Sequence, residues 1–316
     1  MAPPPSASAA AAPKAPPAKR QQSKKRRRSA ASSSSHQLHH FHDLCIDISP
    51  PITTVEHVQE TTRRLGQLGY ASVAFNETVI GREGVKGLDR PGLKKARDTL
   101  WLAAQGGTKD KGPATRLRRV TIIVNDKGEA QFLCGAIRSL KWADLVAARP
   151  TSDKALQLLC EAGDMDIISL DLSARQGFLL STHQADLARG RGIVFEVRYA
   201  GLILEENATK RQQLIANVSG LLAATRGRGV IWSSGANAGV AGECLRGAHD
   251  VMNLAVVLGL KEEQALRAVT ATCEGVRGHA EARRMEWVPV EVVRILRKEG
   301  GREEEEEEGG GEGAEG

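Results

Sequence analysis

The 316-residue sequence has few aromatic residues and no long apolar run. It contains four Trp, two Tyr and five Phe, so stacking of aromatic rings on single-stranded bases would be a minor interaction in this protein. A membrane-spanning helix needs about 18 or more consecutive apolar residues. No such run occurs, and we therefore predict neither a membrane span nor a membrane partner.

The cysteines and the common catalytic motifs give further exclusions. Five cysteines, widely spaced and without a C-x-x-C pair, argue against a disulfide framework and a Cys-based zinc site, and they suit a reducing compartment. The sequence contains no G-x-S-x-G, P-loop, H-E-x-x-H or dinucleotide-binding glycine motif. Ser233-Ser234-Gly235 follows an apolar stretch, but no general base accompanies it, so we expect these small residues to let a loop turn. We predict no catalytic residue.

Charge is distributed unevenly along the chain. Residues 1–35 carry eight Lys or Arg and no acid, whereas residues 299–316 carry nine Glu and one Arg. Because these tails cancel, the net charge of +6 belongs to the body, which holds 35 basic and 29 acidic residues. We predict a disordered basic leader (1–37), one domain (38–288) and a disordered acidic tail (289–316) with its Glu304 to Glu308 run.

The leader contains one compact basic cluster, formed by Lys24, Lys25, Arg26, Arg27 and Arg28. Such a cluster is typical of a nuclear localisation signal, while an acid-free leader with Ser and Arg also fits an organellar transit peptide. We favour nuclear localisation, because the charges form one block without an apolar face at helical spacing. A solvated tail that binds RNA nonspecifically is the plain alternative.

The body alternates short β-rich runs with segments of helical periodicity. We predict strands at 41–48, 71–75, 120–124, 144–148, 166–172, 193–197 and 230–233. We predict helices after Thr54 (ended by Gly69), after Asp153, around 214–222, at 248–258 and at 262–273. The Gly- and Lys/Arg-rich segment 81–115 is predicted to be an insertion with one short helix.

This pattern predicts the fold class. Several of the predicted strands are continuously apolar, as strands of a parallel sheet are when both faces are covered. Seven or so βα units in one body favour a single-domain (β/α) TIM-like barrel over a doubly wound sheet. The doubly wound sheet would be expected to carry a glycine fingerprint after its first strand, and none is present.

Histidines at the first predicted strand raise the possibility of a metal-dependent hydrolase. His40-x-His42, with His39 and Asp43 beside it, resembles the opening metal motif of the polymerase and histidinol phosphatase (PHP) hydrolases. A catalytic metal centre needs further His, Asp or Glu ligands at later strand ends. No His follows those strands, so we predict no metal site and expect the histidines to form a solvated stretch between tail and domain.

Basic residues near strand starts and in loops suggest a nucleic-acid surface. Our candidates are Arg118, Arg119, Arg191, Lys210, Arg211 and Arg246. Arginine supplies both charge and a planar fork that matches phosphate, so a surface carrying many such residues could bind a nucleic-acid backbone. The alternative is that these residues only solubilise the surface.

The ordered motifs of residues 41–285 resemble the 30-kilodalton protein subunit of ribonuclease P and ribonuclease MRP. The strongest matches are R-G-x-x-F-E-V-x-Y (191–199) and R-G-x-x-D-V-x-N-L (246–254). Weaker matches, in the same order along the chain, are F-x-D-L at 41–44, L-G-Y at 68–70, and the stretches 119–124, 144–147 and 164–168. The leader, the acidic tail and segment 81–115 have no counterpart in that family.

The resemblance implies a PHP-like, TIM-barrel-like fold without metal-binding histidines, and a noncatalytic RNA-binding role. In such particles the RNA and its bound Mg²⁺ remove the 5′ leader of precursor tRNA, and the MRP particle acts in ribosomal RNA processing. The implied partners are the particle RNA, precursor tRNA indirectly, and a small Pop5- or Rpp14-type protein. The implied location is the nucleus, with the nucleolus as the expected site, and the chain itself would bind no cofactor. A PHP-type phosphoesterase and a pure protein scaffold are the alternatives.

The resemblance also ranks the candidate residues. Lys210 and Arg211 match a basic pair that starts a helix, and Arg246 opens the second strong motif. Asp250 either orients the Arg246 loop or is an ordinary acid at a helix N-terminus. Glu196 falls within a strand and, if buried, needs a cationic partner such as Arg191 or Arg246.

Overall fold

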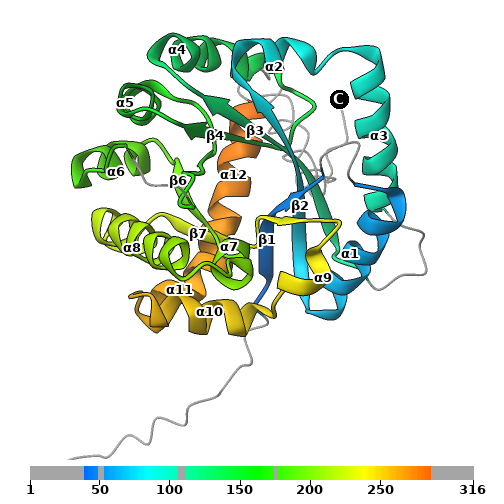
Figure 1. Cartoon of the computed structure of the whole chain (residues 1–316). Coiled ribbons are helices and arrows are strands. Elements are labelled where there is room, and N and C mark those ends of the chain that lie inside the picture. Colours follow the sequence, from blue (N-terminus) through cyan, green and yellow to red (C-terminus); the bar gives the residue numbers. More distant parts are fainter. Residues whose placement is uncertain (1–38, 49–52, 106–111, 174–176, 286–316) are drawn as a thin grey trace, which may run out of the picture. The chain divides into compact units, whose positions relative to one another are not determined.

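The computed structural model describes residues 39–48, 53–105, 112–173 and 177–285 (Figure 1). The predicted leader with its basic cluster and the predicted acidic tail lie outside these residues. No helix in the described ranges is long and apolar enough to cross a membrane.

Eight parallel strands form one sheet in the order β7-β6-β5-β4-β3-β2-β1-β8. They are β1 (Phe41–Asp47), β2 (Tyr70–Ile80), β3 (Thr115–Val124), β4 (Leu145–Pro150), β5 (Ile167–Ile168), β6 (Val194–Arg198), β7 (Val230–Ser233) and β8 (Ala236–Asn237). The predicted strand 230–233 has the observed bounds, whereas the predicted strand 166–172 is reduced to the two residues of β5.

The two ends of the sheet are joined by the chain itself. Strand β7 pairs with β6 and β8 pairs with β1, yet only Ser234 and Gly235 separate β7 from β8. Ser234 Oγ and Gly235 N both donate hydrogen bonds to the carbonyl oxygen of Cys45, at 3.0 and 2.9 Å. The sheet therefore curls into a TIM-like barrel, as predicted, and the small residues after β7 do form the predicted turn, where Gly235 has φ +60°.

Helices surround this sheet (Figure 1). They are α1 (Val55–Gln67), α2 (Gly81–Gly87), α3 (Pro91–Gln105), α4 (Lys127–Ala136), the 3-10 turn η1 (Ile137–Ser139), α5 (Asp153–Ala162), α6 (Thr182–Gly190), α7 (Ala200–Leu204), α8 (Ala208–Thr225), α9 (Ala241–Cys244), α10 (Ala248–Val257), α11 (Glu262–Val269) and α12 (Ala271–Met285). Thr54 caps α1 as predicted, because its side chain accepts a hydrogen bond from His57 N. Helix α5 is instead capped by Ser152, and Asp153 is its first residue.

Segment 81–115 differs from the prediction, because it holds two helices, α2 and α3, instead of one short one. Its apolar face is formed by Leu100, Ala103 and Ala104, and α3 packs against α1. The helical periodicity is weak in the sequence because a charged residue, Arg97, occupies one of the buried positions. Its guanidinium carbon lies 4.1 Å from the centre of the Trp142 ring. The segment is thus part of the helical layer.

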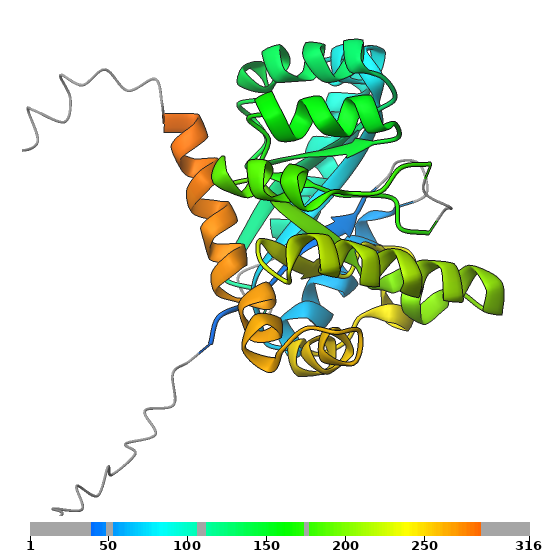
Figure 2. The same cartoon turned by 90° about the vertical axis from the view of Figure 1, so that its left-hand side faces the viewer.

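The last helix, α12, was also not predicted from the sequence. The predicted helix 262–273 breaks at Thr270, whose backbone (φ −129°, ψ −101°) is not helical, and α12 then continues to Met285. Figure 2 shows that α12, in orange, lies at one end of the barrel, whereas the other helices lie around it. Its buried residues Cys273, Val276 and Ala280 pack with apolar residues inside the barrel, such as Leu44. Helix α12 therefore covers the amino ends of the strands.

Candidate functional site

The centre of the barrel holds a buried ion pair between Arg119 of β3 and Glu196 of β6. Arg119 Nη1 and Nη2 donate to Glu196 Oε1 and Oε2 at 2.5 and 2.7 Å, and neither side chain is exposed. Arg119 Nη1 also donates to the carbonyl oxygen of Leu44 at 2.7 Å, and Nε to Thr121 Oγ1 at 3.3 Å. Burial alone would raise the pKa of Glu196, but the charge and hydrogen bonds of Arg119 hold it at about 2.

This pair corrects two predictions. Arg119 was a candidate RNA contact, but it is buried inside the barrel and cannot reach RNA. Glu196 is buried and has a cationic partner, as required, yet that partner is Arg119 and not Arg191 or Arg246. Strand alternation explains why Glu196 points inward, since its neighbours Phe195 and Val197 belong to the core between sheet and helices.

Hydrogen bonds continue from this pair toward the carboxyl ends of the strands. Thr121 Oγ1 donates to Asn76 Oδ1 at 2.6 Å, and Asn76 Nδ2 donates to Asp47 Oδ1 at 2.5 Å. Asp47 Oδ2 lies 3.8 Å from Nη1 of Arg198. A line of polar side chains therefore connects the barrel centre with its carboxyl-end mouth.

Two arginines lie at this mouth, at the ends of their strands: Arg149 on β4 and Arg198 on β6. Strands β4 and β6 both pair with β5, and Arg149 and Arg198 follow the inward-facing Ala147 and Glu196 by two residues, so both side chains point into the barrel. Burial and the charge of Arg198 lower the pKa of Arg149. A cavity of about 120 Å³ beside Arg198 is lined by Asp171, Ser173, Gly201 and Gly235, among others. The carboxyl-end face is where TIM barrels carry their functional sites, so this mouth is the first candidate site.

The first-strand residues His42 and Asp43 are structural in this fold. His42 is 2% exposed, its Nδ1 is hydrogen-bonded to Ser72 Oγ, and burial lowers its pKa to about 4. Asp43 Oδ1 accepts hydrogen bonds from the backbone N–H groups of Cys45 (3.2 Å) and Ser234 (3.0 Å). Burial raises the pKa of Asp43 to about 6. The expectation that the histidines form a solvated stretch is therefore wrong for His42. No group of three or more possible ligands (His, Cys, Asp or Glu) gathers within the described residues.

Arg246 is held by the only two tyrosines of the sequence. Tyr70 Oη donates to the Arg246 carbonyl oxygen at 3.0 Å, and Arg246 N donates to Tyr199 Oη at 3.4 Å. Its guanidinium Nη1 donates to the carbonyl oxygens of Glu243 and Leu245, both at 3.0 Å, at the end of α9. The side chain is half-buried, so part of the guanidinium is anchored by the protein.

Lys210 and Arg211 are exposed in the first turn of α8. Asn207 caps this helix, since its Oδ1 accepts from Lys210 N at 3.1 Å, and Arg211 Nε donates to the Glu205 carbonyl oxygen at 2.9 Å. Helix α7 directly follows the carboxyl end of β6 and contacts α8, which places this basic pair on the carboxyl-end side of the barrel. Arg246 instead bonds to Tyr70, the first residue of β2, and is therefore not grouped with this pair.

Arg118 and Arg191 lie on the opposite, amino-end side and take part in ion pairs. Arg118 Nη1 lies 3.4 Å from Asp98 Oδ1, with its guanidinium carbon 4.7 Å from the centre of the Trp101 ring. Arg191 Nη2 donates to Asp164 Oδ1 at 2.9 Å. The six candidates therefore do not form one surface. Arg119 lies inside the barrel, Arg118 and Arg191 lie at its amino end, Lys210 and Arg211 lie on its carboxyl-end side, and Arg246 lies beside the first residue of β2.

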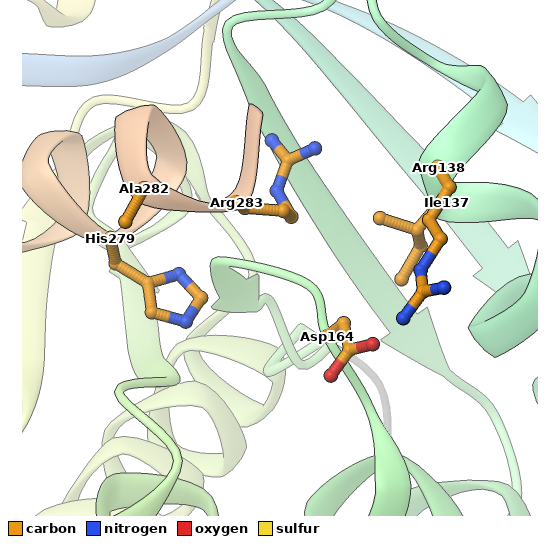
Figure 3. A pocket seen from close by; sticks show the side chains of 6 residues that line it. All are labelled: Ile137, Arg138, Asp164, His279, Ala282 and Arg283. Carbon is orange, nitrogen blue, oxygen red and sulfur yellow. The ribbon is translucent and has the colours of Figure 1, made fainter. Parts of the chain in front are cut away.

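At the amino end, Asp166 joins α12 to the sheet. Arg283 Nη2 donates to Asp166 Oδ2 at 2.9 Å, and His279 Nδ1 lies 2.9 Å from Asp166 Oδ1. The hydrogen bond to Asp166 raises the pKa of His279. His279 and Arg283 line one side of a pocket of about 240 Å³, and Arg138 and Asp164 line the other (Figure 3).

Arg149, Arg198 and the acceptor Asp166 are not among the site residues predicted from the sequence. The signal for the two arginines is present, because each follows directly on an apolar strand run, where a parallel sheet places its functional side chains. No comparable signal marks Asp166, whose partners lie 113 and 117 residues away in the sequence.

Comparison with known proteins agrees with this architecture. Residues 40–285 match the family described as RNase P subunit p30. The chain belongs to this family. It is 28% identical to mouse ribonuclease P protein subunit p30, covering 80% of this chain and 91% of the mouse protein. It is 34% identical to the Arabidopsis thaliana protein GAMETOPHYTE DEFECTIVE 1 over 70% of this chain, and it spans 40% of that longer relative.

A solved structure of archaeal ribonuclease P with mature tRNA contains a chain of the same fold. The TM-score is 0.56, and the match covers 75% of this chain and 91% of the archaeal one at 14% sequence identity. The predicted TIM-like barrel and the predicted family are both confirmed.

Proposed function

We propose that this chain is a noncatalytic, RNA-binding protein subunit of the ribonuclease P and ribonuclease MRP particles. There it supports the removal of the 5′ leader of precursor tRNA and the processing of ribosomal RNA. Cleavage is carried out by the particle RNA with its Mg²⁺, and the chain itself contributes no catalytic residue and binds no cofactor. The family membership of residues 40–285 supports this role.

The arginines inside the barrel favour RNA binding over a metal-dependent activity. At the place where a barrel hydrolase would gather anionic and imidazole ligands, this chain has the cations Arg149 and Arg198, and Arg119 lies deeper inside. A divalent cation would be repelled by two closely spaced guanidinium groups. The same groups attract phosphate, which is the dominant charge of RNA.

The surface residues fit the same role. Lys210 and Arg211 are exposed at the N-terminus of an 18-residue helix, where the helix dipole adds positive potential to their own charge. They give the carboxyl-end side two exposed cations for a nucleic-acid backbone, and the half-buried Arg246 adds a third elsewhere on the surface. This supports an RNA-binding subunit over a pure protein scaffold.

The proposed partners are the particle RNA, precursor tRNA indirectly, and a small protein of the Pop5 or Rpp14 type. The proposed location is the nucleus, and within it the nucleolus, with Lys24 to Arg28 as the signal and an organelle as the alternative. Attaching residues 1–37 to a fluorescent protein tests the signal. Nuclear accumulation that is lost when the five residues are replaced by Ser supports it, and organellar import contradicts it.

Affinity purification of the tagged full chain, with sequencing of the RNA that copurifies, tests the proposed function. We expect the RNA of ribonuclease P or MRP to be enriched, together with a small Pop5- or Rpp14-type protein. The purified chain should cleave neither precursor tRNA nor simple phosphoesters in Mg²⁺ or Mn²⁺. Metal-dependent turnover that is lost in a His42→Ala variant would instead establish a PHP-type phosphoesterase.

A further inference from the structure

Arg149 and Arg198, at the mouth of the barrel, have buried N–H groups without a hydrogen-bond partner. These are Nε and Nη2 of Arg149 and Nε of Arg198. A buried donor without an acceptor destabilises the fold by about 1–3 kcal/mol, and a charged one by more. Arg119 on β3, deeper in the barrel, shows the contrast, since it donates to a carboxylate, a carbonyl oxygen and a hydroxyl oxygen.

Two carboxylates, Asp47 and Asp171, lie near these arginines, and against the effect of burial, hydrogen bonds from Ser173 together with the charges of Arg198 and Arg149 lower the pKa of Asp171. The nearest ion-pair contact of Arg198 is to Asp47 Oδ2 at 3.8 Å, and no described residue forms an ion pair with Arg149. Asp47 Oδ1 is already occupied by Asn76, while Asp171 Oδ1 accepts from both N and Oγ of Ser173. The fold therefore holds two neighbouring guanidinium groups whose donors are only partly used.

Space for an anion lies beside Arg198. The cavity next to Arg198 measures about 120 Å³, whereas a single water needs only about 10–15 Å³ of the same kind of volume. A Cβ atom on Gly235 would lie 2.7 Å from Cβ of Arg198 and 2.8 Å from its Cδ. Gly235 thus fixes the stem of Arg198 against the turn between β7 and β8 and keeps the guanidinium at the mouth.

We propose that the carboxyl-end mouth of the barrel is a phosphate-binding site, in which Arg149 and Arg198 hold the oxygens of one phosphate group. Two guanidinium forks supply directed N–H donors for a tetrahedral oxyanion, and the anion relieves the repulsion between them. The phosphate belongs either to RNA or to a free phosphate ion. Phosphate binding by the chain does not depend on the proposed function. The assignment of that phosphate to RNA rests on the proposed function.

Thermal unfolding of the full chain with inorganic phosphate tests the site, at constant ionic strength set by chloride. We expect a saturable rise in Tm, because a ligand that binds only the folded state stabilises it in proportion to the logarithm of its concentration. Arg149→Met and Arg198→Met should each abolish this rise, and the exposed Arg267→Met should keep it. No rise beyond chloride, or an equal rise in all variants, overturns the proposal.

Two further measurements guard against variants that simply misfold. Circular dichroism should show unchanged secondary structure, and without phosphate the Met variants should be at least as stable as the wild type, because removing an unpaired buried charge removes its desolvation cost. Arg149→Lys and Arg198→Lys keep the charge but lose the fork, so they should retain a weakened response to phosphate. The site is contradicted if the Met variants fold, are less stable than the wild type without phosphate, and still show a rise in Tm with phosphate.

RNA binding distinguishes the two sources of phosphate. Filter binding of the particle RNA should weaken at least about five-fold in Arg149→Met and Arg198→Met, which corresponds to the loss of about 1 kcal/mol, if RNA supplies the phosphate. RNA affinity that stays unchanged while the response to inorganic phosphate is lost assigns the site to a free phosphate ion. A chain that binds phosphate but no particle RNA would refute the proposed function and leave the phosphate site standing.

Discussion

Arg119 and Glu196 lie on strands β3 and β6, 77 residues apart in sequence, and form a bidentate ion pair at the centre of the barrel. Both side chains are fully buried, so each charge depends on the other for its compensation. Because Arg119 also bonds to Leu44 on β1, the pair ties three strands together across the interior. It is a structural element in a place where barrel enzymes usually carry chemistry.

Replacing one member of this ion pair should destabilise the fold far more than replacing both. We expect Arg119→Met or Glu196→Leu to lower the free energy of unfolding by about 3–5 kcal/mol, since each leaves an unpaired buried charge. The double variant should recover most of that loss. Urea unfolding followed by circular dichroism measures all three, and Arg267→Met, which removes an exposed pair with Glu263, is the control. Additive effects in the double variant would show that the two charges act independently.

The amino-end contact between His279 and Asp166 predicts a pH dependence. Because the pKa of His279 is raised in the folded state, its stabilising contribution is fully present below the unfolded pKa of about 6.5 and is lost as the pH rises through the higher folded value. Wild-type stability should therefore fall more than that of His279→Gln between pH 6 and pH 8. Unfolding curves at both pH values measure the difference, and equal slopes in the two proteins would exclude the contact as its cause.

Lys210 should contribute to RNA binding through charge alone. We expect Lys210→Glu to weaken binding of the particle RNA and to reduce the salt dependence of log K, by about 0.7 to 0.9 per lost phosphate contact. Titrations between low and moderate salt measure both effects. The matched control is Arg267→Glu, on α11, which should change neither. Unchanged RNA affinity combined with weaker protein-partner binding would favour the scaffold alternative.

The sequence predicted more of the backbone than of the interior. Thr54 and Gly69 marked both ends of α1, because caps and left-handed glycines act locally. By contrast, Arg118 and Arg119 are neighbours of the same type, and strand alternation places one inside and the other outside without saying which. Choosing between them needs the position of Glu196, a long-range contact that local patterns do not contain.

The two tyrosine hydroxyls that bond to the Arg246 backbone can be removed without changing any charge. Tyr70→Phe removes the hydroxyl that donates to the Arg246 carbonyl oxygen, so stability should fall by about 0.5–1.5 kcal/mol, as for one hydrogen bond. If this clamp positions Arg246 for RNA, RNA affinity should fall as well, although no charge has changed. Urea unfolding and filter binding separate the two effects. Tyr199→Phe, which removes the acceptor for Arg246 N, should behave similarly.

Gly235 should tolerate no side chain, because two independent constraints act on it. Its φ of +60° strains any residue with a Cβ, and that Cβ would collide with the stem of Arg198. We expect Gly235→Ala to lower the free energy of unfolding by more than about 1 kcal/mol, and to weaken the response to phosphate by displacing Arg198. Gly259→Ala, with φ +115° and no atom within 4 Å of its Cβ, carries only the backbone strain. A phosphate response lost equally in both variants would show that backbone strain, and not the placement of Arg198, controls the site.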